Sequence, residues 1–271
     1  MRQIFPVAAT TPEIGRLERG EAGLAAESAV TTLAGLYAYP AAAAGPHSWL
    51  RANMVASADG AGSLNGRTSG LSGAADRLVF SVLRSLADVI LVGAGTARDE
   101  KYRPVKESEV WAALREDRAP TPPVAVITSG RGLDPGSPLL AAPTRSRTIV
   151  LTTAAAPADW RAAVESRADV IVAGRDQVTP GAVVGALAER GYLRILTEGG
   201  PSLLSQITAA GLLNDLCLTY SPVLEGGRSG RIVRAVGGGG TGPATAGTGL
   251  RLAHVLEDDG YLLCRYLCGA G

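Results

Sequence analysis

The sequence predicts an α/β protein with a mostly parallel sheet and helices on both of its faces. Short, continuous apolar runs such as "DVILV" recur along the chain, and such runs are typical of strands buried in a parallel sheet. Segments with helical spacing of apolar residues separate these runs, which is the pattern of βαβ units. With 271 residues, 46% of them hydrophobic, the chain can bury a full core of this kind.

The first half of the chain opens with residues 1–45, which we interpret as an N-terminal extension with helical character around residues 21–36. Residues 46–271 are predicted to form the main domain. Its first strand is "WLRANMVAS", which ends before a turn at Asp59-Gly60. An apolar stripe through Leu78, Val82 and Leu86 then predicts a helix, followed by the strand "DVILV" and a glycine loop.

The second half repeats this alternation. Strands are predicted over residues 124–128, 148–152, 169–173 and the run "YLRIL", with helices between them. One helix has Thr179 as its N-cap, Pro180 at its first position and Gly191 as its stop. A helix over residues 201–211 follows the same pattern.

The C-terminal part predicts an antiparallel end to the sheet. After "DLCLTYSPVL", the glycine-rich residues 237–249 are expected to form a mobile loop. The segment "AHVLEDDGYLLCRYL" then reads as a hairpin around Asp259-Gly260.

Composition argues against several classes of function. The formal net charge of +1 creates no broad field for nucleic acid or an acidic membrane. Three cysteines without a CxxC pair and two distant histidines argue against a disulfide framework or a zinc site. The start lacks the order of a signal peptide and no apolar run approaches membrane length, so we expect a cytoplasmic protein without metal.

Two glycine loops are candidate anion sites. In "TEGGPS", Gly199 and Gly200 follow a buried strand and precede a helix, whose N-terminal N–H groups attract anions. In "VGAGT", residues Gly93, Ala94, Gly95 and Thr96 follow another buried strand, at the strand end where open α/β sheets bind ligands. Each loop alone is equally typical of a plain tight turn. Together they predict a split cradle for the pyrophosphate of a dinucleotide.

Ser129 and Arg131, in "SGRGLD", follow the third strand of the main domain. A hydroxyl and a guanidinium there suit the 2′-phosphate of NADPH, although a solvated loop arginine is as good an interpretation. If they do bind that phosphate, the cofactor is NADPH rather than NADH.

Asp59 and a basic cluster are the candidates for substrate contact. Asp59 could orient a polar heterocycle for hydride transfer, or it could simply form the turn. Arg84, Arg98, Lys101 and Arg103 are mostly expected in solvent, with one or two left to hold a substrate phosphate. Motifs for a covalent nucleophile are absent from the sequence, which favours chemistry carried by a cofactor.

Two long segments carry a family resemblance. They are "NMVASADGAGSLNGRTSGLSGAADRLVFSVLRSLADVILVGAGTARDEKYRP" and "RILTEGGPSLLSQITAAGLLNDLCLTYSPVLEGG". With their S-x-D-G, V-G-x-G-T and T-E-G-G-P motifs, they resemble the pyrimidine reductase family, the reductase domain of bacterial riboflavin biosynthesis. The chain looks most similar to the stand-alone actinobacterial branch. The family has a dihydrofolate-reductase-like fold.

The resemblance implies an NADPH-dependent reduction of 5-amino-6-(5-phosphoribosylamino)uracil, with hydride delivered to C1 of the opened ribose. It implies that Asp59 lies in the substrate pocket with Ser57 beside it, and that Ser72 and Arg84 lie near the substrate phosphate. Two segments would border NADPH, namely residues 93–96 and the segment from Glu198 to Gly200. It also implies a homodimer.

Two departures leave the substrate open. Many members carry a lysine six residues before the aspartate, where this chain has Asn53. The zinc deaminase domain usually fused ahead of the reductase does not fit into residues 1–45. The alternatives are therefore a pterin substrate such as dihydrofolate, or an NADPH-binding module without turnover.

Overall fold

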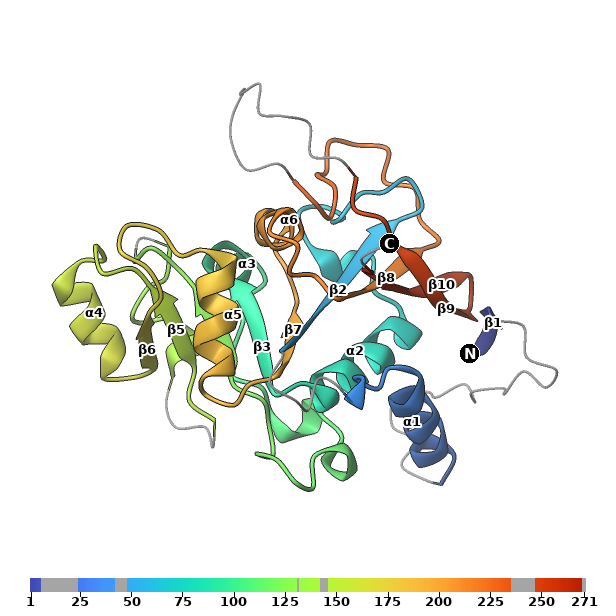
Figure 1. Cartoon of the computed structure of the whole chain (residues 1–271). Coiled ribbons are helices and arrows are strands. Elements are labelled where there is room, and N and C mark those ends of the chain that lie inside the picture. The colour runs from blue at the N-terminus through green and yellow to red at the C-terminus, as the bar shows by residue number, and fades with distance from the viewer. Residues whose placement is uncertain (6–23, 42–47, 131, 142–145, 235–246, 270–271) are drawn as a thin grey trace.

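The structure is a computed structural model that describes residues 1–5, 24–41, 48–130, 132–141, 146–234 and 247–269 (Figure 1). The helices of these residues, apart from single turns, are α1 (Leu24–Leu36), α2 (Ala74–Leu86), α3 (Ala94–Asp99), α4 (Ala158–Glu165), α5 (Pro180–Ala188) and α6 (Pro201–Ala209). The strands are β1 (Arg2–Phe5), β2 (Trp49–Ser57), β3 (Val89–Gly93), β4 (Val124–Ile127), β5 (Ile149–Thr152), β6 (Asp169–Val172), β7 (Arg194–Thr197), β8 (Asp215–Ser221), β9 (Arg251–Asp258) and β10 (Tyr261–Leu267).

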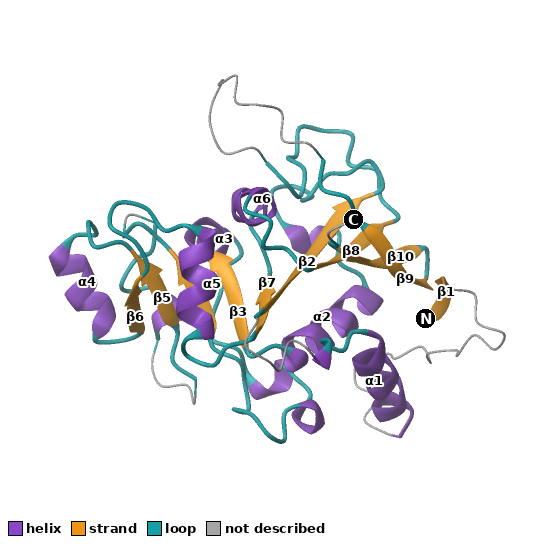
Figure 2. Cartoon of the chain, viewed as in Figure 1, coloured by secondary structure: helices purple, strands orange, loops and turns teal. Residues whose placement is uncertain are grey.

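All of these strands join one sheet in the order β1-β9-β10-β8-β2-β7-β3-β4-β5-β6 (Figure 2). Neighbouring strands are parallel from β8 through β2, β7, β3, β4 and β5 to β6. At the other end of the sheet, β10, β9 and β1 pair antiparallel with their neighbours. Strand β7 lies between β2 and β3, so a late segment of the chain is inserted between two early ones.

The sheet separates two apolar cores. Alternate residues of a strand point to opposite faces, and on β3 Ile90 and Val92 join the core under α1, α2 and α3, whereas Val89 and Leu91 join the core under α5 and α6. Burial on both faces is the reason that the strand has no polar residue. The predicted fold class, an α/β protein with a mostly parallel sheet, helices on both faces and an antiparallel C-terminal hairpin, is confirmed.

Several local predictions are confirmed as well. The Thr179 hydroxyl accepts a hydrogen bond from the Ala182 N–H, which caps α5. The hairpin between β9 and β10 turns at Asp259 and Gly260, which both have positive φ, as a tight two-residue turn requires.

The structure differs from the sequence prediction at two places. The expected glycine loop after β3 is instead the first turn of α3, because Gly93 stays extended and Ala94 to Asp99 coil directly behind it. Within the predicted N-terminal extension, β1 pairs with β9 and α1 contacts α2. Four residues are too few to show strand alternation. The expected mobile loop lies largely outside the described residues, and the division of the chain after residue 45 stays a prediction.

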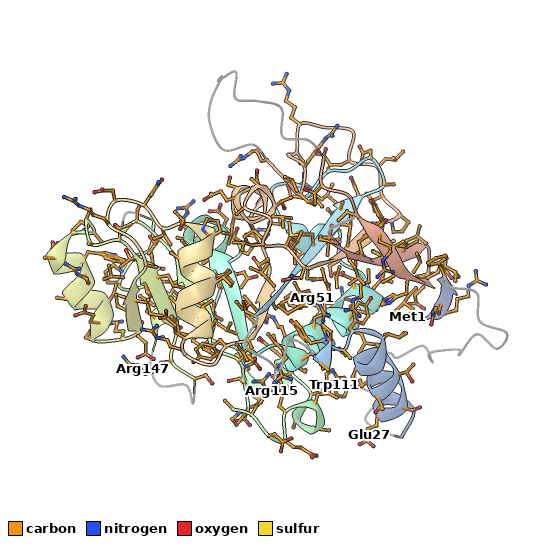
Figure 3. The ribbon with its side chains drawn as sticks, viewed as in Figure 1. Met1, Glu27, Arg51, Trp111, Arg115 and Arg147 are labelled. Atoms are coloured by element: carbon orange, nitrogen blue, oxygen red, sulfur yellow. The ribbon has the colours of Figure 1, made fainter. Side chains whose placement is uncertain are left out.

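A buried ionic cluster ties α1 to the sheet. The carboxylate of Asp215 accepts hydrogen bonds from Arg51 and Arg265, the shortest at 2.7 Å from each. The same arginines donate to the carbonyls of Tyr37 and Leu36 at the end of α1, at 2.7 and 2.6 Å. Arg51 lies in the interior with no exposed surface (Figure 3). Burial alone would raise the pKa of Asp215, but the two guanidinium groups hold it below its ordinary value.

We predict that Asp215→Ala lowers the free energy of unfolding by about 3–5 kcal/mol, because it leaves two buried cations without a counter-ion. Urea denaturation measures the change. The matched control is Asp169→Ala, which breaks an exposed ion pair with Arg147 and is expected to cost less than about 1 kcal/mol. Equal losses for the two variants would contradict this account of the cluster.

Candidate active site

The candidate site lies at the sheet edge where the parallel strands β2, β7, β3 and β4 end. Because these strands are parallel neighbours, the loops that follow them meet at one edge. This arrangement places the segments that contain Asp59, Glu198, Ala94 and Ser129 along the same side of the molecule.

The two glycine segments are in direct contact. The Gly93 N–H donates to the Gly199 carbonyl at 3.2 Å. Gly200 lies so close to the Thr96 hydroxyl that a side chain at this position would collide with it. Gly199 has a φ of +103°, which favours glycine, and it packs beside Met54. The structure therefore brings together the two halves of the predicted cradle.

The cradle has room for a ligand beside part of its backbone. A Cβ atom built on Gly93 or Gly95 would meet no atom within 4 Å. The N-terminus of α6 begins directly after Gly200, so free N–H groups and a positive dipole end lie at the same place. These features fit the pyrophosphate of a dinucleotide.

A cleft of about 870 Å³ adjoins the cradle. Three of its walls come from β2, from α2 and from the segment that follows α3. Five of the residues predicted for the site line it, namely Asn53, Ser72, Arg84, Thr96 and Glu198. Lys101 and Arg103 also line it and add positive charge. Trp111, labelled in Figure 3, is a further lining residue and donates its indole N–H to the Ser81 hydroxyl at 2.8 Å.

Arg84 and Glu198 form a two-pronged ion pair in the cleft. Two nitrogens of Arg84 each donate to a different oxygen of Glu198 at 2.8 Å. Tyr102 donates its hydroxyl to the same carboxylate at 2.7 Å, and Glu109 accepts from Arg84 at 3.1 Å. The Arg84 guanidinium also stacks 4.2 Å from the centre of the Phe80 ring. Helix α2 is thereby fixed to the loop after β7.

Sequence reasoning missed the cleft residues Asp76, Phe80 and Tyr102. The signal for the first two was present, because Asp76, Phe80 and Arg84 are spaced by four residues and so share one face of α2. Asp76 is buried, with 7% of its surface exposed, and accepts a hydrogen bond from Ser72 at 2.5 Å. Tyr102 follows the end of a short helix, and no sequence pattern pointed to it.

Asp59 lies at the end of β2 but is not among the residues that line the cleft. Its carboxylate accepts hydrogen bonds from the Ser57 hydroxyl and from the N–H groups of Glu225 and Gly226. These bonds, that from Ser57 first, lower the pKa of Asp59 to about 2. In this structure Asp59 fastens the loop after β8, and its predicted contact with substrate stays a prediction.

Of the other predicted site residues, the structure describes Ser57 and Ser129, and neither lines the cleft. Ser57 is buried, and its hydroxyl also accepts from the Ala61 N–H at 2.9 Å. Ser129 is exposed just beyond β4, the strand next to β3. Arg131 lies outside the described residues. In the part of the chain that the structure describes, no three His, Cys, Asp or Glu residues gather to hold a metal ion, and no helix is long and apolar enough to cross a membrane.

The chain belongs to the RibD C-terminal domain family, whose model matches residues 48–262. A similar curated protein is 2,5-diamino-6-ribosylamino-4(3H)-pyrimidinone 5′-phosphate reductase of Archaeoglobus fulgidus, which is 29% identical over 65% of this chain and 81% of its own. The protein of the same name from Methanothermobacter thermautotrophicus is 27% identical over 60% and 73%. A pyrimidine reductase-like protein from Corynebacterium diphtheriae has a similar fold, with a TM-score of 0.74, 24% identity and coverage of 89% of this chain and 99% of its own. The resemblance predicted from the sequence motifs is confirmed.

We predict that the Asp59 carboxyl titrates near pH 2 rather than near its ordinary value of about 4. A carboxyl with a lowered pKa in the folded state stabilises the fold above its ordinary pKa, and this contribution disappears as the pH falls from about 4 to 2. Carbon-detected NMR of the carboxyl measures the midpoint. A midpoint near 4 would show that Asp59 does not fasten the loop after β8.

Proposed function

We propose that this protein is a reductase that uses NADPH to reduce the ribosyl group of a pyrimidine ribosylamine phosphate, as in riboflavin biosynthesis. The observation that carries the proposal is the contact between the two glycine segments at the edge of a charged cleft, in a chain of the RibD C-terminal domain family. The substrate is 5-amino-6-(5-phosphoribosylamino)uracil or its 2-amino counterpart, the compound in the names of the curated relatives.

The cofactor is assigned to the two glycine segments. Residues 93–96 and 198–200 surround the pyrophosphate position, and the N-terminus of α6 attracts its negative charge. Ser129 and Arg131 are assigned to the 2′-phosphate, since Ser129 follows the strand beside β3. When bound, NADPH supplies a hydride, and the residues of the chain bind and orient the two reactants.

The substrate is assigned to the cleft. Arg84, joined by Lys101 and Arg103, provides the positive charge that a phosphate requires. Ser72 also lines the cleft, but its hydroxyl donates to Asp76, so its place near the phosphate stays a prediction. Glu198 keeps Arg84 in place through its two hydrogen bonds. Asn53 on β2 lines the cleft at the position where many members of the family have a lysine. We therefore assign an uncharged amide, rather than an ammonium group, to contact with the substrate. Ser57 is the last residue of β2 and Asp59 follows it. We propose that Asp59 orients the reacting group of the substrate.

We also propose that the protein acts as a homodimer in the cytoplasm. The family resemblance supports the dimer, and three cysteines without a CxxC pair suit a reducing compartment. Size-exclusion chromatography with light scattering measures the mass of the particle.

The test is consumption of NADPH by the purified protein with three substrates in parallel: the uracil compound, its 2-amino counterpart and dihydrofolate. We expect turnover with at least one of the two pyrimidines. Turnover of dihydrofolate alone would identify a pterin reductase. Binding of NADPH without turnover of any substrate would identify a binding module and contradict the proposal.

We predict that Arg131→Ala weakens NADPH binding by about 1.5–3 kcal/mol, the loss expected for a hydrogen bond to a charged group. NADH lacks the 2′-phosphate, so its affinity is expected to stay nearly constant. Titration calorimetry with both cofactors measures the difference, and Arg175→Ala, at a surface loop after β6, is the matched control. Equal losses for NADPH and NADH would remove Arg131 from the 2′-phosphate site.

A further inference from the structure

Asp76 is a buried carboxyl group in the wall of the cleft that no step above uses. It lies in the first turn of α2, and 7% of its surface is exposed. The Ser72 hydroxyl donates to one of its oxygens at 2.5 Å, and the hydroxyl of Thr219 on β8 is its second partner. Thr219 is paired with Val55 of β2, another residue that lines the cleft. The carboxyl is therefore held in place from both the helix and the sheet.

The partners of Asp76 leave part of its hydrogen-bonding capacity for a ligand. An ionised carboxylate has about four acceptor positions, and the two hydroxyls use two of them. Burial raises the pKa of Asp76, and the hydroxyls compensate only in part. A ligand that brings two N–H donors to this carboxylate would relieve its desolvation.

The two candidate pyrimidines differ in this respect. A 2-amino-4(3H)-pyrimidinone presents two adjacent donors, the ring N3–H and the 2-amino group, and these match the two oxygens of a carboxylate. On the same edge, the uracil presents one donor, N3–H, between two carbonyl oxygens, so one carboxylate oxygen would face an acceptor. A site built around a buried hydrogen-bonding group rejects the ligand that leaves it unpaired.

We propose that Asp76 binds the N3–H and 2-amino edge of the pyrimidine and thereby selects the 2-amino compound over its deaminated, uracil counterpart. The inference rests on the proposed function for its choice of ligands. It also makes Asp76 a specificity residue that contacts the substrate ring, at one end of the row formed by Asp76, Phe80 and Arg84 along α2.

The test is titration calorimetry of both compounds in the presence of NADP⁺, using the full chain and the variant Asp76→Asn. We expect the unaltered protein to bind the 2-amino compound about 10- to 100-fold more tightly. The side-chain amide of Asn can accept from N3–H and donate to the carbonyl at C2, so Asp76→Asn is expected to reverse or abolish the preference. Asp159→Asn is the matched control, because it also removes an acidic residue from the first turn of a helix.

Three results would overturn the inference. They are equal binding of the two compounds by the unaltered protein, tighter binding of the uracil, or an equal loss for both compounds in a folded Asp76→Asn variant. The first two need no variant and so remain decisive if Asp76→Asn does not fold; Asp76→Ser, which is smaller and uncharged, then replaces it.

Turnover is recorded separately, so that the failure of this inference and the failure of the proposed function can be told apart. Selective binding of the 2-amino compound without NADPH consumption would support the assignment of Asp76 and contradict the reductase. Equal kcat/KM for the two compounds would support the reductase and contradict the selection by Asp76.

Discussion

The carboxylate of Asp215 is the interaction on which the arrangement of this protein depends. It accepts from Arg51 on β2 and Arg265 on β10, and both arginines reach the last carbonyls of α1. One buried anion therefore joins three neighbouring strands and a helix from the start of the chain. Without the Asp215 carboxylate, the two buried guanidinium groups would have no counter-ion, which would strongly destabilise the fold. Because β2 carries Asn53 two residues after Arg51, the cluster also fixes the strand that forms one wall of the cleft.

The site follows from the insertion of β7 between β2 and β3. This topology places the loop with Glu198 and two glycines beside the start of α3, where a side chain at position 200 would collide with the Thr96 hydroxyl. The pair between Arg84 and Glu198 then links that loop to α2. The two glycine segments and the cleft are thus held by a single set of contacts, a rigidity that suits the orientation of two reactants.

Much of the fold was predictable because its signals are local. The continuous apolar run of β3 is visible in the sequence and is buried on both faces of the sheet. Thr179 caps α5 by a hydrogen bond within one helical turn. The glycine segments were found for the same reason. The hydrogen bonds between Asp59 and Gly226 and between Arg84 and Glu198 could not be predicted, because these partners lie more than a hundred residues apart in the sequence. Asp76 was overlooked because an acidic residue in the first turn of a helix is explained by the helix dipole alone.

The most direct test of the central claim is the fate of the hydrogen at C4 of the nicotinamide. The purified protein is supplied with NADPH deuterated at that carbon and with the ribosylamino pyrimidine phosphate, and the product is analysed by mass spectrometry and NMR. The account predicts one deuterium, bonded to C1 of the ribityl chain. A reduced product that carries no deuterium, or deuterium on the pyrimidine ring, would contradict it.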